Sequence, residues 1–223
     1  MHAMYSIWTI DAEFGQPSGM QAIPYSLSIR DMKTGDVVVS TSIDYGMALS
    51  DIDATLKPYV TSSRTTQSYV LTQRYLSKFY TGLKTHGLTL REVGEAIRKA
   101  GFSPDTHRVL SWHSSVDVFI FHRALLGDSA LLSPRTESKL GSLLDSGGRN
   151  CLQPFNVAVM LQHCSDLAYT RCGYVFRSLL PGISMEMHLA DNDTFAMYQI
   201  YKRLMLESAP WVERERVAHG QGI

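Results

Sequence analysis

Two acids, Asp11 and Glu13, stand at the end of an apolar, strand-like run near the start of the chain, in the sequence SIWTIDAEFG. In a strand, residues two apart point to the same face, so both carboxylates would project together. Like charges held that close raise one another's pKa and destabilise the fold unless a cation lies between them. The pair therefore favours a divalent-metal site. The alternative is that the strand stops at Ile10 and that both acids are solvated loop residues.

A third acid, Asp117, follows a predicted strand and opens a predicted helix, in the sequence SWHSSVD. The carboxyl-terminal edge of a strand is where α/β folds place their ligands. If this strand lies beside the first and parallel to it, Asp117 faces Asp11 and Glu13. Because Ser114 stands three residues before Asp117, the same residues also match a capping box, which would give Asp117 a purely structural role.

His188 and Asp193 stand at the entrance of the last predicted helix, with Asp191 between them, in the sequence HLADND. An acid that holds a cation and a histidine that takes a proton from water together suit metal-assisted hydrolysis. In the alternative, Asp191 or Asp193 caps the helix and His188 is an ordinary loop or packing residue. This segment is ambiguous by itself, as the other two are.

Hydrophobic periodicity predicts the elements that would have to bring these segments together. β-branched and aromatic residues predict a first strand over 4–11, and two strand-like runs around the turn at 33–36 complete an antiparallel meander. Helical spacing that ends at Gly101 predicts a helix over 89–101. The other expected elements are an irregular helical stretch over 50–80, a strand over 107–112, a helix over 114–126, a surface excursion over 127–150, a fifth strand and a helix within 151–164, and a long helix over 193–208 with Tyr198, Tyr201 and Met205 on one face. This order predicts an α/β fold around a mixed sheet.

Composition limits the classes of protein to which the chain can belong. Its 223 residues, 44% of them hydrophobic, suit one domain, expected over 1–212, with a polar and loose tail over 213–223. There is no signal-peptide pattern and no apolar run of about 20 residues, which predicts an intracellular protein, in the cytoplasm or nucleus, with no membrane partner. Three cysteines, an odd number, agree with a reducing compartment. At zero net charge, a polyanion would have to be held by a local patch or by metal ions.

Taken in order, the three segments resemble the motifs of the DEDDh family of 3′–5′ exonucleases, with IDAEFG as the first motif, SWHSSVD as the second and HLADND as the third. The resemblance covers nearly the whole chain and implies an RNase H-like fold, which is a mixed five-stranded sheet flanked by helices. The family's second motif usually reads Gly-His-Asn ahead of the Asp, where this chain has Ser111, Trp112 and His113. In the third motif, Asn192 stands just before the final Asp. These departures concern substrate handling more than chemistry.

The resemblance also implies a role for each motif residue. The implied ligands of two divalent cations, Mg²⁺ or Mn²⁺, are Asp11, Glu13, Asp117 and Asp193. The implied general base is His188, a task suited to an imidazole at neutral pH. The implied substrate-binding residues are Phe14, Gly15, Trp112 and His113. An aromatic such as Phe14 can stack on a terminal base and a glycine lets backbone approach a sugar, although Phe14 could equally be a core residue.

The expected function is metal-dependent hydrolysis of phosphodiester bonds from the 3′ end of a single-stranded nucleic acid. RNA is favoured over DNA because DAEFG resembles the first motif of RNA-trimming relatives. One alternative is a catalytically inactive module of the same fold that binds nucleic acid or a protein partner, although such a module gains nothing from four mutually repelling carboxylates. A weaker alternative is an RNase H-type endonuclease, which does not need His188 in that position.

Overall fold

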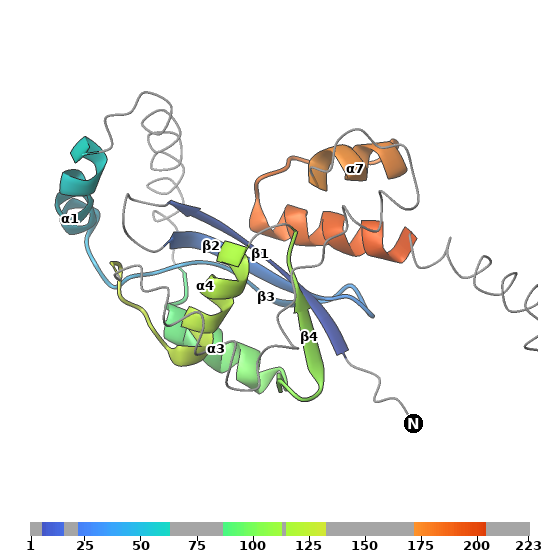
Figure 1. The fold of residues 1–223 in the computed structure, drawn as a ribbon, viewed down its shortest axis with the longest axis horizontal. Coiled ribbons are helices and arrows are strands. Elements are labelled where there is room, and N and C mark those ends of the chain that lie inside the picture. The colour runs from blue at the N-terminus through green and yellow to red at the C-terminus, as the bar shows by residue number, and fades with distance from the viewer. Residues whose placement is uncertain (1–5, 16–21, 63–86, 113–114, 133–171, 204–223) are drawn as a thin grey trace, which may run out of the picture.

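The computed structural model describes residues 6–15, 22–62, 87–112, 115–132 and 172–203. Within them the chain folds as a mixed α/β structure, a four-stranded sheet flanked by helices (Figure 1). The expected α/β class and mixed sheet are therefore confirmed. The tail expected over 213–223 lies outside the described residues.

The sheet has the strand order β3-β2-β1-β4. The strands are β1 Ser6–Gly15, β2 Ile23–Asp31, β3 Val37–Ser42 and β4 His107–Leu110. β1, β2 and β3 form the predicted antiparallel meander, and β4 runs parallel to β1 on its other side. The parallel neighbour is the arrangement that Asp117 needs in order to face the acids of β1. The expected fifth strand falls within 151–164, outside the described residues.

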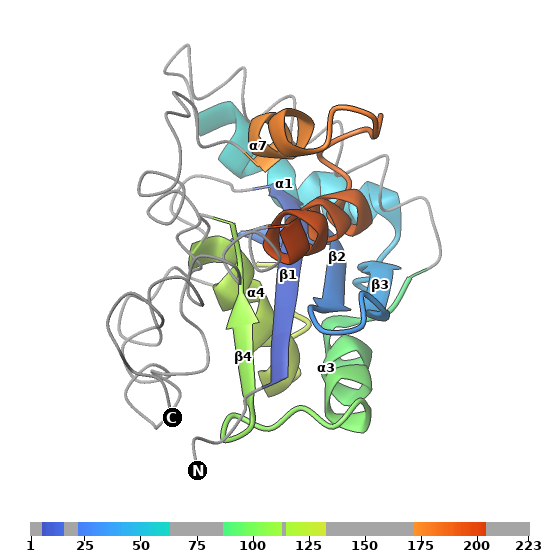
Figure 2. The same cartoon turned by 90° about the vertical axis from the view of Figure 1, so that its right-hand side faces the viewer.

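Helices cover the sheet on both faces. They are α1 Leu49–Ser62, α3 Leu90–Lys99, α4 Ser115–Leu126, α7 Cys172–Leu179 and a last described helix over 190–203. Helices α3 and α4 lie on one face, while the last described helix lies on the other with α7 packed against it (Figures 1 and 2). Among these helices none is both long and apolar enough to cross a membrane.

The sequence of α3 shows why a helix forms where the periodicity predicts one. Thr89 accepts a hydrogen bond from the N–H of Glu92, while the Glu92 carboxylate accepts one from the N–H of Thr89, which completes a capping box. Gly101, at φ 91°, ends the segment in a conformation that favours glycine. A Cβ at Gly94 would overlap the carbonyl oxygen of Ala124, so this glycine allows α3 to pack closely against α4.

Side chains of β1 alternate between a core face and a polar face. The residues of the core face belong to the main hydrophobic core that α3 and α4 complete, and they are Trp8, Ile10 and Ala12. On the opposite face, the hydroxyl of Thr9 donates to the sulfur of Met197 in the last described helix, at 3.2 Å. Asp11 and Glu13 continue this second face because strand side chains repeat every two residues. The pleat therefore turns both acids toward the last helix.

The last described helix buries residues other than the tyrosines of the predicted face. Tyr198 and Tyr201 are half-buried, and Met205 lies outside the described residues. The buried residues of this helix are Ala190, Asp193, Thr194, Ala196, Met197 and Ile200. The side of the helix that the sheet and α7 cover therefore consists mainly of smaller side chains.

Candidate metal centre

The acids of the first segment are strand residues. Asp11 and Glu13 both pair with residues of β2, and β1 ends only at Gly15. The alternative in which the strand stops at Ile10 and leaves two loop acids is therefore wrong. Both side chains are partly buried and project from the same face of the strand, so their charges lie near one another.

Asp117 reaches the same place from α4. It lies in the first turn of that helix and is only 3% exposed. Its Oδ1 accepts a hydrogen bond from the backbone N–H of Ala12 at 3.2 Å. Ala12 stands between Asp11 and Glu13, so this bond joins the second segment to the first. Ser114, the other half of the alternative capping box, lies outside the described residues.

His188 and Asp193 are joined by a tight local turn. The backbone N–H of His188 donates to Oδ2 of Asp193 at 2.9 Å. His188 has φ 68°, and it is the one non-glycine residue with positive φ in the described parts of the chain. Such a conformation is unfavourable for most side chains, although histidine tolerates it better than most. The turn leaves the imidazole exposed while the carboxylate is buried.

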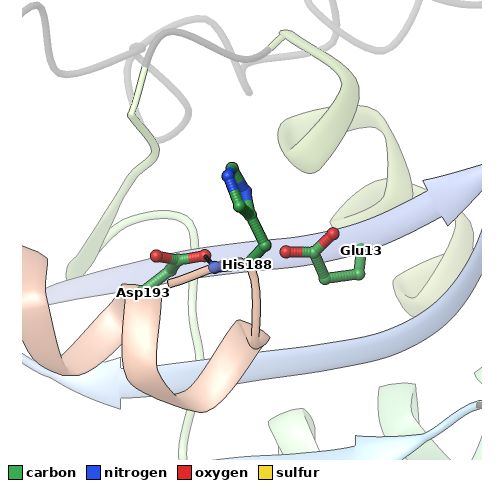
Figure 3. Close-up of side chains that lie close together, drawn as sticks. All are labelled: Glu13, His188 and Asp193. Carbon is green, nitrogen blue, oxygen red and sulfur yellow. Dashed lines mark hydrogen bonds between the residues drawn. The ribbon is translucent and has the colours of Figure 1, made fainter. Parts of the chain in front are cut away.

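Glu13, His188 and Asp193 converge at the end of β1 (Figure 3). Each offers a ligand atom, and these atoms all lie within 4.8 Å of one another. Asp11 and Asp117 are not part of this group of three. The pKa of Asp11 is nevertheless raised well above its ordinary value, first by burial and then by the charges of Asp117, Asp193 and Glu13. Asp11 thus lies within electrostatic reach of the other three carboxylates.

This donor set fits divalent cations. Carboxylate oxygens are the ligands that Mg²⁺ and Mn²⁺ prefer in proteins. Burial and each of the three neighbouring charges oppose the ionisation of Asp11, so a cation among these groups would relieve the repulsion. The residues that could hold such cations are the predicted ones, Asp11, Glu13, Asp117 and Asp193.

Tyr25 supports the site, and the sequence reasoning missed it. The pairing of β1 with β2 shifts register after Glu13, since Glu13 lies opposite Ser26 and Phe14 opposite Pro24. Tyr25 is therefore the extra residue of a β-bulge, a device that re-aims a side chain. Its hydroxyl donates to Oε2 of Glu13 at 3.2 Å. No sequence signal marks this bulge, because it depends on the register between two strands.

A network of polar side chains anchors the start of the last described helix to β2. The guanidinium of Arg30 forms an ion pair with Asp191 at 2.8 Å and donates to the carbonyl of Gly35 at 2.8 Å. The hydroxyl of Ser28 lies 2.9 Å from that of Thr194. Asp191 therefore fixes the helix entrance to the sheet. An arginine that alternates with apolar strand residues would ordinarily be assigned to a solvated face, so Arg30 was missed.

The described residues among those implied in substrate binding lie in different surroundings. Phe14 is half-buried and packs against the main core. Trp112, also half-buried, packs against the cluster between α7 and the last described helix. Gly15 is buried, yet a Cβ there would meet no atom within 4 Å. His113 lies outside the described residues, and a role in binding substrate stays a prediction for all four.

Cys172, at the start of α7, lies near the acids. Burial first, and then the charges of Asp193 and Asp11, raise the pKa of its thiol. In the metal-free protein the neutral thiol is therefore favoured, and the cysteine packs with the apolar cluster beside the site.

The sequence matches no known protein-family model and no curated protein.

Proposed function

We propose that this chain is a metal-dependent 3′–5′ exonuclease that acts on nucleic acid, with RNA favoured over DNA. The observation that carries the proposal is the convergence of three segments that are separated in sequence by about 100 residues and then by about 70. Asp117 bonds to the backbone between Asp11 and Glu13, and Glu13 meets His188 and Asp193. The resemblance of these segments to the DEDDh motifs supplies the reaction.

The proposal includes an RNase H-like fold with five strands. The β3-β2-β1-β4 order, with a three-stranded antiparallel meander and a parallel fourth strand, supports it. The fifth strand is the one that the sequence predicts within 151–164, outside the described residues. This assignment rests on the resemblance and on the sequence of that segment.

In the proposed reaction the protein's own groups bind the cations, orient the base and remove a proton from the attacking water. When bound, two divalent cations, Mg²⁺ or Mn²⁺, supply polarisation of the attacking water and of the leaving 3′ oxygen. Asp11, Glu13, Asp117 and Asp193 hold them. The exposed imidazole of His188 takes the proton from the water, which typically contributes about 10²–10⁴-fold to a rate. Asp193 also orients this base through the backbone N–H of His188.

Labelled oligonucleotides test the proposal. RNA and DNA strands carrying a 5′ label should be shortened stepwise from the 3′ end when Mg²⁺ or Mn²⁺ is present, and EDTA should stop the reaction. A blocked 3′ terminus should prevent degradation, while a blocked 5′ terminus should not. Rapid cutting of a circular strand would instead favour an endonuclease, and binding without cleavage in either metal would favour the inactive module.

A further inference from the structure

The position of His188 has a consequence beyond base catalysis. Its imidazole lies within ligand distance of the Glu13 and Asp193 carboxylates, the three ligand atoms all falling within 4.8 Å of one another (Figure 3). A nitrogen or oxygen ligand atom lies about 2.0–2.2 Å from a zinc ion. Two ligand atoms bound to the same ion are therefore at most about 4.4 Å apart. Small side-chain rotations would therefore close the three groups around a single ion.

Hydrogen bonds or backbone conformation restrict the position of each of the three groups. The hydroxyl of Tyr25 donates to Glu13 at 3.2 Å, and the N–H of His188 donates to Asp193 at 2.9 Å. The φ of 68° at His188 keeps the imidazole on the side of the carboxylates at a conformational cost. Hydrogen bonds of this kind orient the ligands of metal sites and reduce the entropy lost on binding.

The chemistry of the donors decides which metal fits. One nitrogen and two carboxylates differ from the all-oxygen set that Mg²⁺ prefers, because a neutral imidazole is a good ligand for Zn²⁺ and other transition-metal ions. The four-carboxylate set of Asp11, Glu13, Asp117 and Asp193 has the opposite preference. Glu13 and Asp193 belong to both sets, so the two kinds of metal would compete.

We propose that Glu13, His188 and Asp193 form a site for one transition-metal ion, with Zn²⁺ as the representative, whose binding takes His188 out of its role as base. An imidazole nitrogen whose lone pair is bound to an ion has no lone pair left to accept a proton. Zinc would therefore inhibit cleavage supported by Mg²⁺. The binding part of this inference stands on the geometry, and the inhibition rests on the proposed function.

The test begins with calorimetric titration of Zn²⁺ into metal-free wild-type protein, His188→Asn and Glu186→Gln. Asparagine tolerates the left-handed backbone at position 188, so this variant should fold. Glu186 is an exposed acid of the same turn and is not in the group of three, which makes it a matched control. The chain has 8 histidines, and others among them can also bind zinc. The measured quantity is therefore the zinc site that wild type has and His188→Asn lacks.

One zinc site should be weakened about tenfold or more in His188→Asn, since even outer-shell partners of a metal ligand contribute that much. The same site should remain in Glu186→Gln, and Mg²⁺ affinity should be alike in all three proteins. Equal zinc binding by wild type and His188→Asn would overturn the inference. If His188→Asn does not fold, wild type alone suffices: Zn²⁺, but not Mg²⁺, should protect His188 from acylation by diethyl pyrocarbonate, and equal modification would overturn the proposal.

An activity measurement separates this inference from the proposed function. Zinc should inhibit Mg²⁺-supported cleavage over the concentrations that fill the calorimetric site. Zinc binding that depends on His188 in a protein without nuclease activity would uphold the site and refute the proposed function. Cleavage by a protein whose zinc binding does not depend on His188 would uphold the nuclease and refute the site.

Discussion

The carboxylate of Asp117 accepts a hydrogen bond from the backbone N–H of Ala12 at 3.2 Å. β4 pairs with β1 over Ser6–Thr9, and Ala12 lies beyond that pairing, where α4 begins. A helix that follows a parallel strand thus delivers its first-turn acid to the end of the neighbouring strand. The bond places a carboxylate from the second segment between the two acids of the first.

Substitution of Asp117 should separate its bonding role from its charge. Asp117→Asn keeps an oxygen that can accept from Ala12 and should retain the fold, but it should lower turnover by about a hundredfold or more because a metal ligand loses its charge. Asp117→Ala should in addition cost about 1–3 kcal/mol of unfolding free energy, since the N–H of Ala12 loses this partner. Single-turnover rates and denaturant titrations measure the two effects. Equal stability of both variants would show that the bond to Ala12 contributes little.

The raised pKa of Asp11 predicts how the stability of the metal-free protein depends on pH. Because burial and neighbouring charges raise this pKa above 3.8, the folded state binds more protons than the unfolded state at pH values above about 4. The contribution of Asp11 to the free energy of unfolding should therefore be greatest below about pH 4 and should be lost as the pH rises through the raised pKa. Asp11→Asn should remove this part of the decline, and saturating Mg²⁺ should weaken it. Urea titrations in EDTA across this range give the slope, and an unchanged slope in Asp11→Asn would place its cause elsewhere.

His188→Asn should separate the base from the ligands of the Mg²⁺ ions. The variant should fold and bind Mg²⁺ like wild type, yet lose about a hundredfold in turnover, which is typical when a general base is removed. Asparagine is preferable to alanine because position 188 has φ 68°. Glu186→Gln, in the same turn, should cleave at the wild-type rate. Turnover by His188→Asn above about a third of wild type would leave the proposed mechanism without its base.

Arg30 should contribute more to stability than its partner Asp191 does. The side chain of Arg30 is 9% exposed and that of Asp191 is 51% exposed, so their ion pair is partly screened by water. Arg30 also donates to Gly35 and lies over the ring of Phe195, at 5.4 Å from its centroid. Its buried Nε has no hydrogen-bond partner in the described part of the chain, which offsets part of the gain.

The expected losses are about 2 kcal/mol for Arg30→Met and under about 1 kcal/mol for Asp191→Asn. Chemical denaturation of the single and double variants measures both losses and the coupling between them. Because the network seats the helix that carries Asp193, Arg30→Met should also weaken Mg²⁺ binding. A loss of stability with unchanged Mg²⁺ affinity would limit Arg30 to the fold.

Local sequence determined the elements of this protein. β-branched and aromatic residues mark β1, helical spacing that ends at Gly101 marks α3, and the turn at 33–36 marks the meander. These signals can be recognised in the sequence because each comes from interactions between residues close in the chain. The chemical candidates could be recognised for a related reason, since two carboxylates two positions apart in a strand share a face and raise one another's pKa unless a cation lies between them.

Tertiary structure alone decided which of these candidates meet and what supports them. The bulge that aims Tyr25 at Glu13 depends on strand register, and the buried stripe at Ala196 and Ile200 depends on α7 covering the last helix. The group of Glu13, His188 and Asp193 joins residues about 175 positions apart. The order of the motifs suggested one shared site, but local patterns in the sequence do not fix which side chains meet, because the free energy of a long-range contact depends on how every intervening element packs.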